Sequence, residues 1–325
     1  MLFLGYSGIF YHAIIKIKLE DKTMKKIFAI LLTLVLVAGV FAACGAGTEE
    51  TTVAGETTTG EKLTATDGVL VMATNAAFPP YEFKEGDDFA GIDVEIAGKI
   101  AEKLGLTLEI KDVEFGSIVG GVQTGKFDMG MAGMTVTDER LESVNFSTSY
   151  ATGIQVVIVA EGSAIKSLDD LKGDGSMKFG VQQDTTGDIY ASDTAENGGY
   201  GEENVVRYKT GADAVQALKT GKVDAVIIDN EPAKSFVAAN EGLTILDGEW
   251  TLENYAIAIA KENTALLTAV NNALAELTAD GTVASIVAKY IPASEETTEA
   301  ADETTEAAAE ETTEAAAEET TEAAA

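Results

Sequence analysis

Hydrophobic and polar residues follow two alternating periods along residues 67–292. Runs of strand length, "GVLVMAT" at 68–74 and "LTLEIKDV" at 106–113, flank "GIDVEIAGKIAEKLG" at 91–105, whose apolar residues recur at helical spacing. Gly105 suits the left-handed cap that ends such a helix, and the apolar face consists of Ile92, Ile96, Ile100 and Leu104. Strands that alternate with helices predict parallel sheets covered on both faces, so the expected fold class is α/β.

One helix–turn–strand unit occurs twice, in "GSIVGGVQTGKFDMGMAG" at 116–133 and in "GADAVQALKTGKVDAVIID" at 211–229. Each copy has a short amphipathic helix, a glycine that suits its C-cap, an aspartate in the turn and then a strand-like run. Two further strands are expected before the second copy, at 177–183 and 205–209. The repeated order predicts two similar α/β lobes.

The two copies place Gly133 and Asp229 at corresponding strand ends, one in each lobe. Shared turn chemistry accounts for the aspartates of the two turns. It does not account for an acid at the end of the apolar run "AVIID", where burial without a partner is costly. Ligands of open parallel sheets bind beyond the C-terminal ends of the strands, so both positions are candidates for a ligand site.

Arg140 lies in the first turn of a short helix that is predicted to begin after its N-cap, Thr137. A cation there meets the positive end of the helix dipole. Arg140 therefore either binds a ligand or forms an exposed ion pair with Glu139 or Glu142. For the first alternative, the planar guanidinium can hold a carboxylate at two points, and the hydroxyl of Thr135 can add a donor.

Opposite charges in the two lobes suit the two charged groups of a free amino acid. Arg140 and Thr135 in the first lobe can hold the α-carboxylate. Asp229 in the second lobe can accept the α-ammonium. The residues alone therefore predict an amino-acid site between the lobes.

The N-terminal residues have the composition of a targeting segment. From Met24 the chain has two lysines, about seventeen mostly apolar residues and small residues before Cys44, which predicts a signal peptide over 1–43. Residues 1–23 are expected to precede the true start. Cys44 lies where the lipobox of bacterial lipoproteins has its lipidated cysteine; the alternative is a plain membrane anchor. Residues 44–66 are polar and predict a flexible tether.

Charge is concentrated in two regions of the chain. Residues 293–325 repeat "ETTEA" and hold twelve acids and no bases, which predicts an extended low-complexity tail. Of the net charge of −32, about −20 falls on residues 67–292. A domain this acidic is not expected to bind nucleic acid, which requires a basic face.

The only histidine is His12, within the predicted signal segment. This excludes Ser-His and Cys-His nucleophilic catalysis and nearly all zinc chemistry in the mature chain. "GGVQTGKF" at 120–127 fails as a phosphate-binding loop, because Phe127 stands where Ser or Thr is needed. No catalytic residue, metal or cofactor is expected.

Residues 67–292 resemble the solute-binding proteins of polar and basic amino-acid ABC transporters, the bacterial extracellular solute-binding family 3, which includes glutamine-, histidine- and arginine-binding proteins. The matching stretches are "VLVMATNAAFPPYEF", "GIDVEIAGKIAEKLG", "MAGMTVTDER", "FGVQQDTTGDIYA", "VDAVIIDNEP" and "NNALAELTADGTVASIVAKY". The resemblance implies a two-lobed periplasmic-binding-protein type II fold, with a mainly parallel sheet in each lobe. Two crossover strands, expected near 150–154 and 252–255, would join lobe 1 (67–150 and 255–292) to lobe 2 (151–254).

The resemblance also implies roles for particular residues. Gly133 would join Arg140 and Thr135 at the α-carboxylate, and Asp229 would take the α-ammonium. The ligand side chain would contact five residues: Asn75, Phe78, Phe115, Gln182 and Thr186. Taken alone, the two phenylalanines would more often be core residues. Many relatives have Asp in place of Asn75. Asp184 either caps the following helix or supplies the missing charge, so the bound amino acid stays open.

The expected function is that of a monomeric, lipid-anchored extracytoplasmic protein. It would close its lobes over a free amino acid and deliver it to an ABC permease in the membrane. One alternative is a dehydratase-like enzyme on the same fold, against which the missing histidine argues. The other is a ligand-sensing subunit, which would need a separate signalling partner.

Overall fold

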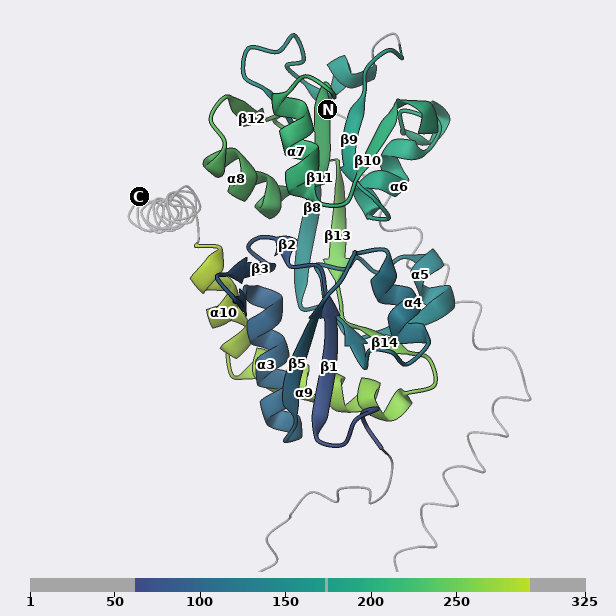
Figure 1. Cartoon of the computed structure of the whole chain (residues 1–325), viewed down its shortest axis with the longest axis vertical. Coiled ribbons are helices and arrows are strands. Elements are labelled where there is room, and N and C mark those ends of the chain that lie inside the picture. Colours follow the sequence, from purple (N-terminus) through teal and green to yellow (C-terminus); the bar gives the residue numbers. More distant parts are fainter. Residues whose placement is uncertain (1–61, 173–174, 249, 293–325) are drawn as a thin grey trace, which may run out of the picture. The chain divides into compact units, whose positions relative to one another are not determined.

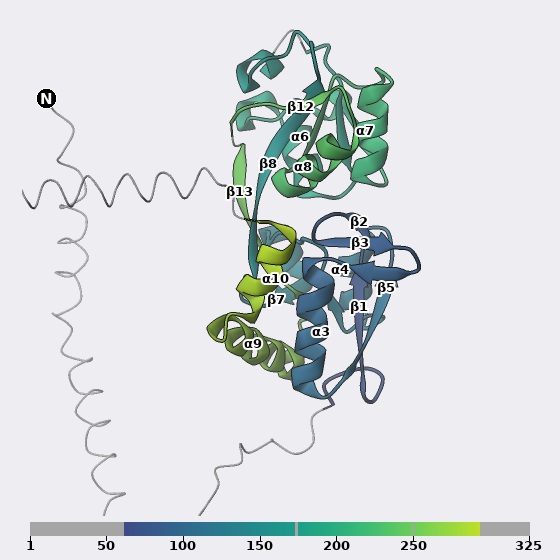
Figure 2. The ribbon, with the colours of Figure 1, turned by 90° about the vertical axis from the view of Figure 1, so that its left-hand side faces the viewer.

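The computed structural model describes residues 62–172, 175–248 and 250–292, which form two α/β lobes (Figures 1 and 2). The predicted signal peptide, Cys44, most of the tether and the acidic tail lie outside these residues. No helix within the described ranges is long and apolar enough to cross a membrane.

The first lobe is built on a five-stranded sheet of order β5-β1-β6-β14-β7, in which the first three strands run parallel and the last two pair antiparallel. Its strands are β1 (Val69–Thr74), β5 (Thr107–Asp112), β6 (Met129–Gly130), β7 (Val144–Phe146) and β14 (Ala258–Ala260). Its helices are α3 (Ile92–Leu104), α4 (Ser117–Gln123), α5 (Asp138–Ser143), α9 (Thr264–Ala279) and α10 (Thr282–Tyr290). A small antiparallel sheet borders it, formed by β2 (Ala77–Phe78), β3 (Glu82–Glu85) and β4 (Asp88–Ala90).

The second lobe repeats this plan on a six-stranded sheet. Strands β10-β9-β11 are parallel, and β8, β12 and β13 add antiparallel pairs. The strands are β8 (Ala151–Ala160), β9 (Phe179–Gln182), β10 (Val205–Tyr208), β11 (Ala225–Asp229), β12 (Leu243–Ile245) and β13 (Thr251–Tyr255). The helices are α6 (Thr186–Ser192), α7 (Gly211–Lys219) and α8 (Asn230–Ala239), with short 3₁₀ turns η1 (Leu168–Lys172), η2 (Ala195–Asn197) and η3 (Glu202–Asn204).

Two adjacent antiparallel strands, β8 and β13, run between the lobes (Figure 2). Their register pairs Ala151 with Tyr255 at one end and Gln155 with Thr251 at the other. Because both strands start in one lobe and end in the other, side chains on them reach the junction where a ligand would contact both lobes.

The predicted helices and their caps are confirmed. Helix α3 ends at Gly105, which has a φ of 68°, and it buries Ile92, Ile96 and Ile100 completely. Each copy of the repeated unit has its glycine in the left-handed region, Gly125 at 72° and Gly221 at 68°. These turns are therefore specified locally by the sequence.

The repeated aspartates, Asp128 and Asp224, connect their turns to neighbouring strands through hydrogen bonds. Asp128 accepts hydrogen bonds from the backbone N–H groups of Ala65 (2.7 Å) and Val71 (2.8 Å), at the start of the first lobe. Asp224 accepts one from Lys178 (2.8 Å), immediately before β9. Turn and strand chemistry therefore explain this part of the repeat without a ligand.

The two strand ends differ more than the repeat suggests. Strand β11 ends at Asp229, as expected, whereas β6 is only two residues long and ends at Gly130. Gly130 has no room for a side chain, because a Cβ there would lie 2.5 Å from Ile118 Cγ2. The chain then leaves the sheet, and Gly133 follows in an irregular segment with a φ of 52°.

Candidate ligand-binding site

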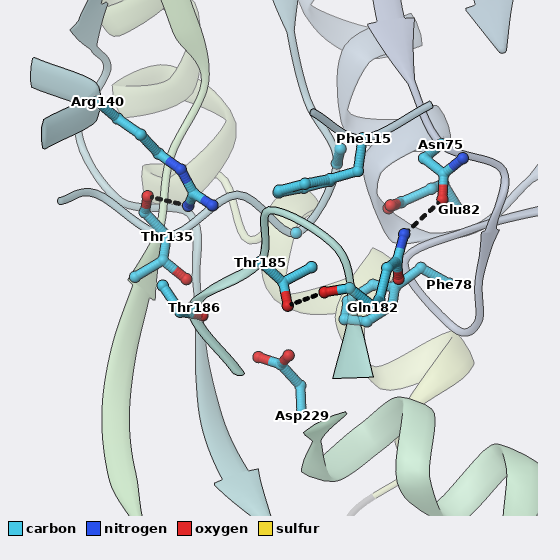
Figure 3. Close-up of a pocket in the computed structure, with 12 residues that line it drawn as sticks. Asn75, Phe78, Glu82, Phe115, Thr135, Arg140, Gln182, Thr185, Thr186 and Asp229 are labelled. Carbon is cyan, nitrogen blue, oxygen red and sulfur yellow. Dashed lines mark hydrogen bonds between the residues drawn. The ribbon is translucent and has the colours of Figure 1, made fainter. Parts of the chain in front are cut away.

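A cavity lies between the lobes and is lined by residues from both. Figure 3 shows residues from both lobes around it. All nine residues predicted from the sequence for the ligand line it, together with three that were not: Glu82, Ala132 and Thr185. The structure thus brings the predicted residues together, and their roles in binding stay predictions.

Arg140 enters the cavity from the first turn of α5. Thr137 is the N-cap of this helix, as predicted, and its hydroxyl accepts from the Arg140 N–H at 3.2 Å. The guanidinium is buried, and it donates from Nη1 to the Thr135 carbonyl (2.8 Å) and from Nη2 to the Asp184 carbonyl (3.0 Å). Neither Glu139 nor Glu142 pairs with it among the ion pairs of the described residues.

Phe115 supports the guanidinium from one face, with its ring centroid 5.2 Å from Arg140 Cζ. Burial lowers the pKa of Arg140, and the nearby charge of Glu253 opposes that shift. Because arginine has five N–H groups and two serve backbone carbonyls, the remaining donors can hold a carboxylate. The arrangement is that of a fixed cation rather than a surface ion pair.

Asp229 faces the cavity from the end of β11 and is buried. One oxygen accepts from the Tyr255 hydroxyl, and the other accepts from Gln155 Nε2 at 2.9 Å. Burial, with a further contribution from Glu253, raises the pKa of Asp229 to about 8. A cationic group placed here would therefore both satisfy the carboxylate and draw off its proton.

Glu253 and Gln155 connect Asp229 to the first lobe. Gln155 Nε2 also donates to Glu253 Oε2 (3.1 Å), and the same oxygen accepts from the Thr135 hydroxyl (3.0 Å). Gln155 lies on β8 and Glu253 on β13, the two connecting strands. The carboxylate and ammonium ends of the predicted site therefore belong to one hydrogen-bonded network that crosses the junction.

The far end of the cavity is formed by amides and an acid. Gln182 Nε2 donates across the lobes to Asn75 Oδ1 (2.9 Å), and Asn75 Nδ2 donates to the Val113 carbonyl (2.8 Å). Thr186, which was also predicted for the ligand side chain, lies instead beside Thr135 (Figure 3), and its hydroxyl accepts from Gln155 Nε2 at 3.4 Å. Figure 3 shows Asn75 and Glu82 on the opposite side of the cavity from Arg140.

Asp184 is not the cap of α6, which was one of the two roles that the sequence left open. Thr185 is the N-cap of α6, and its hydroxyl accepts from the Asp188 N–H at 3.3 Å. Asp184 instead has a φ of 64°, its N–H donates to Asp188 Oδ2 (3.0 Å), and its carbonyl accepts from Arg140. Its side chain is not among those lining the cavity, so it does not supply the charge that Asn75 lacks.

Glu82 is the residue that sequence reasoning missed. It stands opposite Phe78 in the β2–β3 pair, and its side chain is completely buried. Neither carboxyl oxygen meets a donor in the described part of the chain, and no other residue that lines the cavity has such an atom. Burial, followed by the nearby Asp93, raises the pKa of Glu82 well above its usual range. The sequence signal that could have found Glu82 is the position of an acid between two aromatic residues, Tyr81 and Phe83.

The described residues contain no group of three His, Cys, Asp or Glu side chains able to hold a metal ion. The charged residues that line the cavity are one buried cation, Arg140, and two buried acids, Asp229 and Glu82.

Comparison with known proteins identifies the family. The sequence model of the bacterial extracellular solute-binding proteins, family 3, matches residues 70–293. The chain belongs to this family. It is 32% identical over 224 residues to the arginine-binding extracellular protein ArtP of Bacillus subtilis. The matched region covers 68% of this chain and 85% of ArtP.

Solved structures of the family support the same assignment. An ancestral arginine-binding protein bound to arginine is 39% identical, with a TM-score of 0.63 over 69% of this chain and 98% of that one. The ancestral protein bound to glutamine is 38% identical, with a TM-score of 0.64 over 70% and 100%. The expected family and its two-lobed fold are thus confirmed for this solute-binding protein.

The buried acids predict an unusual pH dependence of folding stability. The pKa of Asp93 is raised to about 6 and that of Asp229 to about 8, in both cases chiefly by burial. Between the unfolded value near 4 and these folded values, the folded state binds more protons, so the free energy of unfolding must fall as pH rises. We expect the ligand-free melting temperature to drop by roughly 5–10 °C from pH 5 to pH 8.

No histidine of the described residues titrates in this pH range, because the chain's only histidine, His12, lies outside them. Differential scanning calorimetry at several pH values, on protein dialysed to remove amino acids, makes the measurement. A melting temperature that is flat or rises over this range would contradict the raised pKa values of Asp93 and Asp229.

Proposed function

We propose that this protein captures a free L-amino acid with a cationic side chain, such as L-arginine, between its two lobes. Arg140 and the hydroxyl of Thr135 hold the α-carboxylate. Asp229 takes the α-ammonium, and Glu82 pairs with the cationic side chain. Phe78 and Phe115 cover its aliphatic part.

The observation that carries the proposal is the fully buried carboxyl group of Glu82 at the cavity wall, which meets no donor within the described residues apart from the neighbouring acid Asp93. Buried polar atoms are rarely left without a hydrogen-bond partner, and an unpaired carboxylate is costly. Gln182 already donates to Asn75, and Asn75 to the Val113 carbonyl, so these amides make a weaker demand on a ligand. A guanidinium or ammonium group would supply the missing donors and a balancing charge.

Contacts between the lobes support closure over the ligand. Gln182 reaches Asn75, Arg140 reaches the Asp184 carbonyl, and Lys209 Nζ lies 2.6 Å from Glu114 Oε1. The relatives' names support an amino-acid ligand, since two of the proteins compared are arginine-binding. They are binding proteins rather than enzymes, which favours capture over a dehydratase-like reaction. The captured amino acid is proposed to be delivered to an ABC permease, and the family of the chain supports this role.

We expect the predicted ligand class to emerge from a thermal-shift screen of the twenty amino acids. A ligand at 100 times its dissociation constant stabilises the folded state by about 2.7 kcal/mol, which raises the melting temperature by roughly 5–10 °C. L-Arginine and L-lysine should give the largest shifts. If acidic or apolar amino acids give larger shifts than both, the cationic assignment is wrong.

Anchoring through Cys44 completes the proposed function and lies outside the described residues. Mass spectrometry of protein extracted from membranes should find a diacylglycerol-modified Cys44 as the first residue. A Cys44→Ala variant should lose this modification and leave the membrane fraction or accumulate as precursor. Native protein that still begins at Met1 or Met24 would contradict the proposal.

A further inference from the structure

Behind the side-chain end of the cavity, Glu82 meets a second acid. Asp93 lies on α3 and, like Glu82 on β3, is completely buried. Asp93 was not a predicted site residue, and it does not line the cavity. It sits on the buried face of α3 beside Ile96 and Ala97, where an apolar residue would be expected. An acid at such a position requires an explanation.

Asp93 is held in place by donors on one oxygen only. Its Oδ2 accepts from the Gly133 N–H (2.9 Å) and from the Tyr150 hydroxyl (2.8 Å). Its Oδ1 and both oxygens of Glu82 meet no donor from elsewhere in the described ranges. The two carboxyl groups interact with each other. Since an ionised carboxylate has no hydrogen to donate, a hydrogen bond between them requires a proton on one of the pair.

The groups around the pair favour its protonated form, with the proton on Glu82. Asp93 has two donors that stabilise its anion, and its pKa is raised only to about 6, whereas burial raises the pKa of Glu82 well above its usual range. The titratable groups that face Glu82 are acids or neutral hydroxyls: Asp93, Asp229, Tyr81 and Tyr150. Arg140, the cation of the site, lies across the cavity (Figure 3).

We propose that Glu82 and Asp93 share one proton, and that this proton determines which ligand side chains the cavity accepts. With the proton in place, Glu82 donates it to Asp93 Oδ1 and offers its carbonyl oxygen to an uncharged N–H donor, such as an amide or a urea. When a cationic side chain enters, the proton passes to the solvent and the Glu82 carboxylate pairs with the cation. Asp93 is the positioning residue that makes both states available. This inference rests on the proposed function, since it assigns two modes to the same amino-acid site.

The exchange has two measurable consequences. Binding of a cationic ligand releases a proton that an uncharged ligand of the same shape does not release. The preference for the cationic ligand also increases with pH, by at most about tenfold for each pH unit.

L-Citrulline is the matched probe, because a urea replaces the guanidinium of L-arginine with little change in shape. The experiment is calorimetric titration of the full chain with each ligand at pH 7, in two buffers with different ionisation enthalpies. Both ligands bring an α-ammonium to Asp229, so any proton released there cancels in the difference. We expect L-arginine to release an excess of 0.5 to 1 proton, roughly, over L-citrulline.

Two variants separate the members of the pair. In Asp93→Asn, the amide oxygen can still accept from Gly133 and Tyr150, while its N–H₂ donates to Glu82 and keeps it ionised. L-Arginine should still bind, without the excess proton. In Glu82→Gln, L-citrulline should bind within about threefold of wild type, and L-arginine should lose at least tenfold. Glu85→Gln, an exposed acid on the same strand, is the matched control and should behave as wild type.

The outcomes distinguish this inference from the proposed function. If L-arginine does not bind the wild-type protein, the proposed function fails and the inference fails with it. If L-arginine and L-citrulline both bind with equal proton release, the shared proton is wrong and the amino-acid site stands. If L-citrulline does not bind at all, the uncharged mode is wrong. The wild-type comparison alone decides these points, even if Asp93→Asn does not fold.

Discussion

Replacing Arg140 with alanine is expected to weaken L-arginine binding by about 100-fold or more. The substitution leaves the ligand's α-carboxylate facing a buried site without its cation. Each charge-assisted hydrogen bond contributes about 1.5–3 kcal/mol, and breaking a buried ion pair costs about 3–5 kcal/mol. Since 1.4 kcal/mol is one decade in affinity, two or more decades follow. Isothermal titration calorimetry measures the loss.

Agmatine, which is L-arginine without its carboxylate, shows whether the loss comes from the proposed contact. It should bind wild type weakly and the Arg140→Ala variant about equally weakly, because the two deletions remove the same interaction. Arg140→Lys keeps the charge and loses the planar fork, so its affinity should be intermediate. If Arg140→Ala loses affinity for L-arginine and agmatine by the same factor, Arg140 acts through the Thr135 and Asp184 carbonyls rather than through the ligand.

Replacing Asp229 with asparagine is expected to weaken L-arginine binding by roughly 30- to 100-fold, since a neutral amide replaces the charge that faces the α-ammonium. The shape is conserved, and Tyr255 and Gln155 can rearrange around the amide. The probe is 5-guanidinopentanoate, which is L-arginine without its ammonium group. It should bind wild type poorly and the variant no worse.

Asp224→Asn is the control for this substitution. It makes the same change just before the same strand, at an exposed aspartate that holds the Lys178 N–H and does not line the cavity. Its affinity for L-arginine should equal that of wild type. Equal losses in the two variants would mean that the Asp229 effect is one of folding, and a melting curve for each variant would show it.

The sequence predicted much of the fold because the fold rests on local signals. Helix α3 follows from the spacing of its isoleucines and from Gly105, and Thr137 caps α5 through its own side chain. The doubled unit predicted two lobes because each turn glycine, Gly125 and Gly221, must adopt a left-handed conformation. The close approach of Ile118 to Gly130, the last residue of β6, could not be predicted, since it brings together residues of two elements.

The sequence predicted those site residues whose charge is unfavourable in the local structure around them. Arg140 in a first helical turn and Asp229 at the end of an apolar strand both stand out in the sequence. Glu82 and Asp93 do not, because their significance depends on complete burial and on three oxygens, both of Glu82 and Oδ1 of Asp93, that meet no N–H or hydroxyl donor within the described residues. The role of Asp184 stayed open in the sequence, because capping geometry distinguishes it from Thr185 only after the backbone is placed.

A crystal structure of the protein with L-arginine would show where each end of the ligand lies. We expect one ligand between the lobes, with its carboxylate on Arg140, its α-ammonium on Asp229 and its guanidinium within hydrogen-bond distance of Glu82. A ligand bound in the reverse orientation, with its guanidinium at Asp229, would contradict the proposed site, as would a ligand bound outside the cavity.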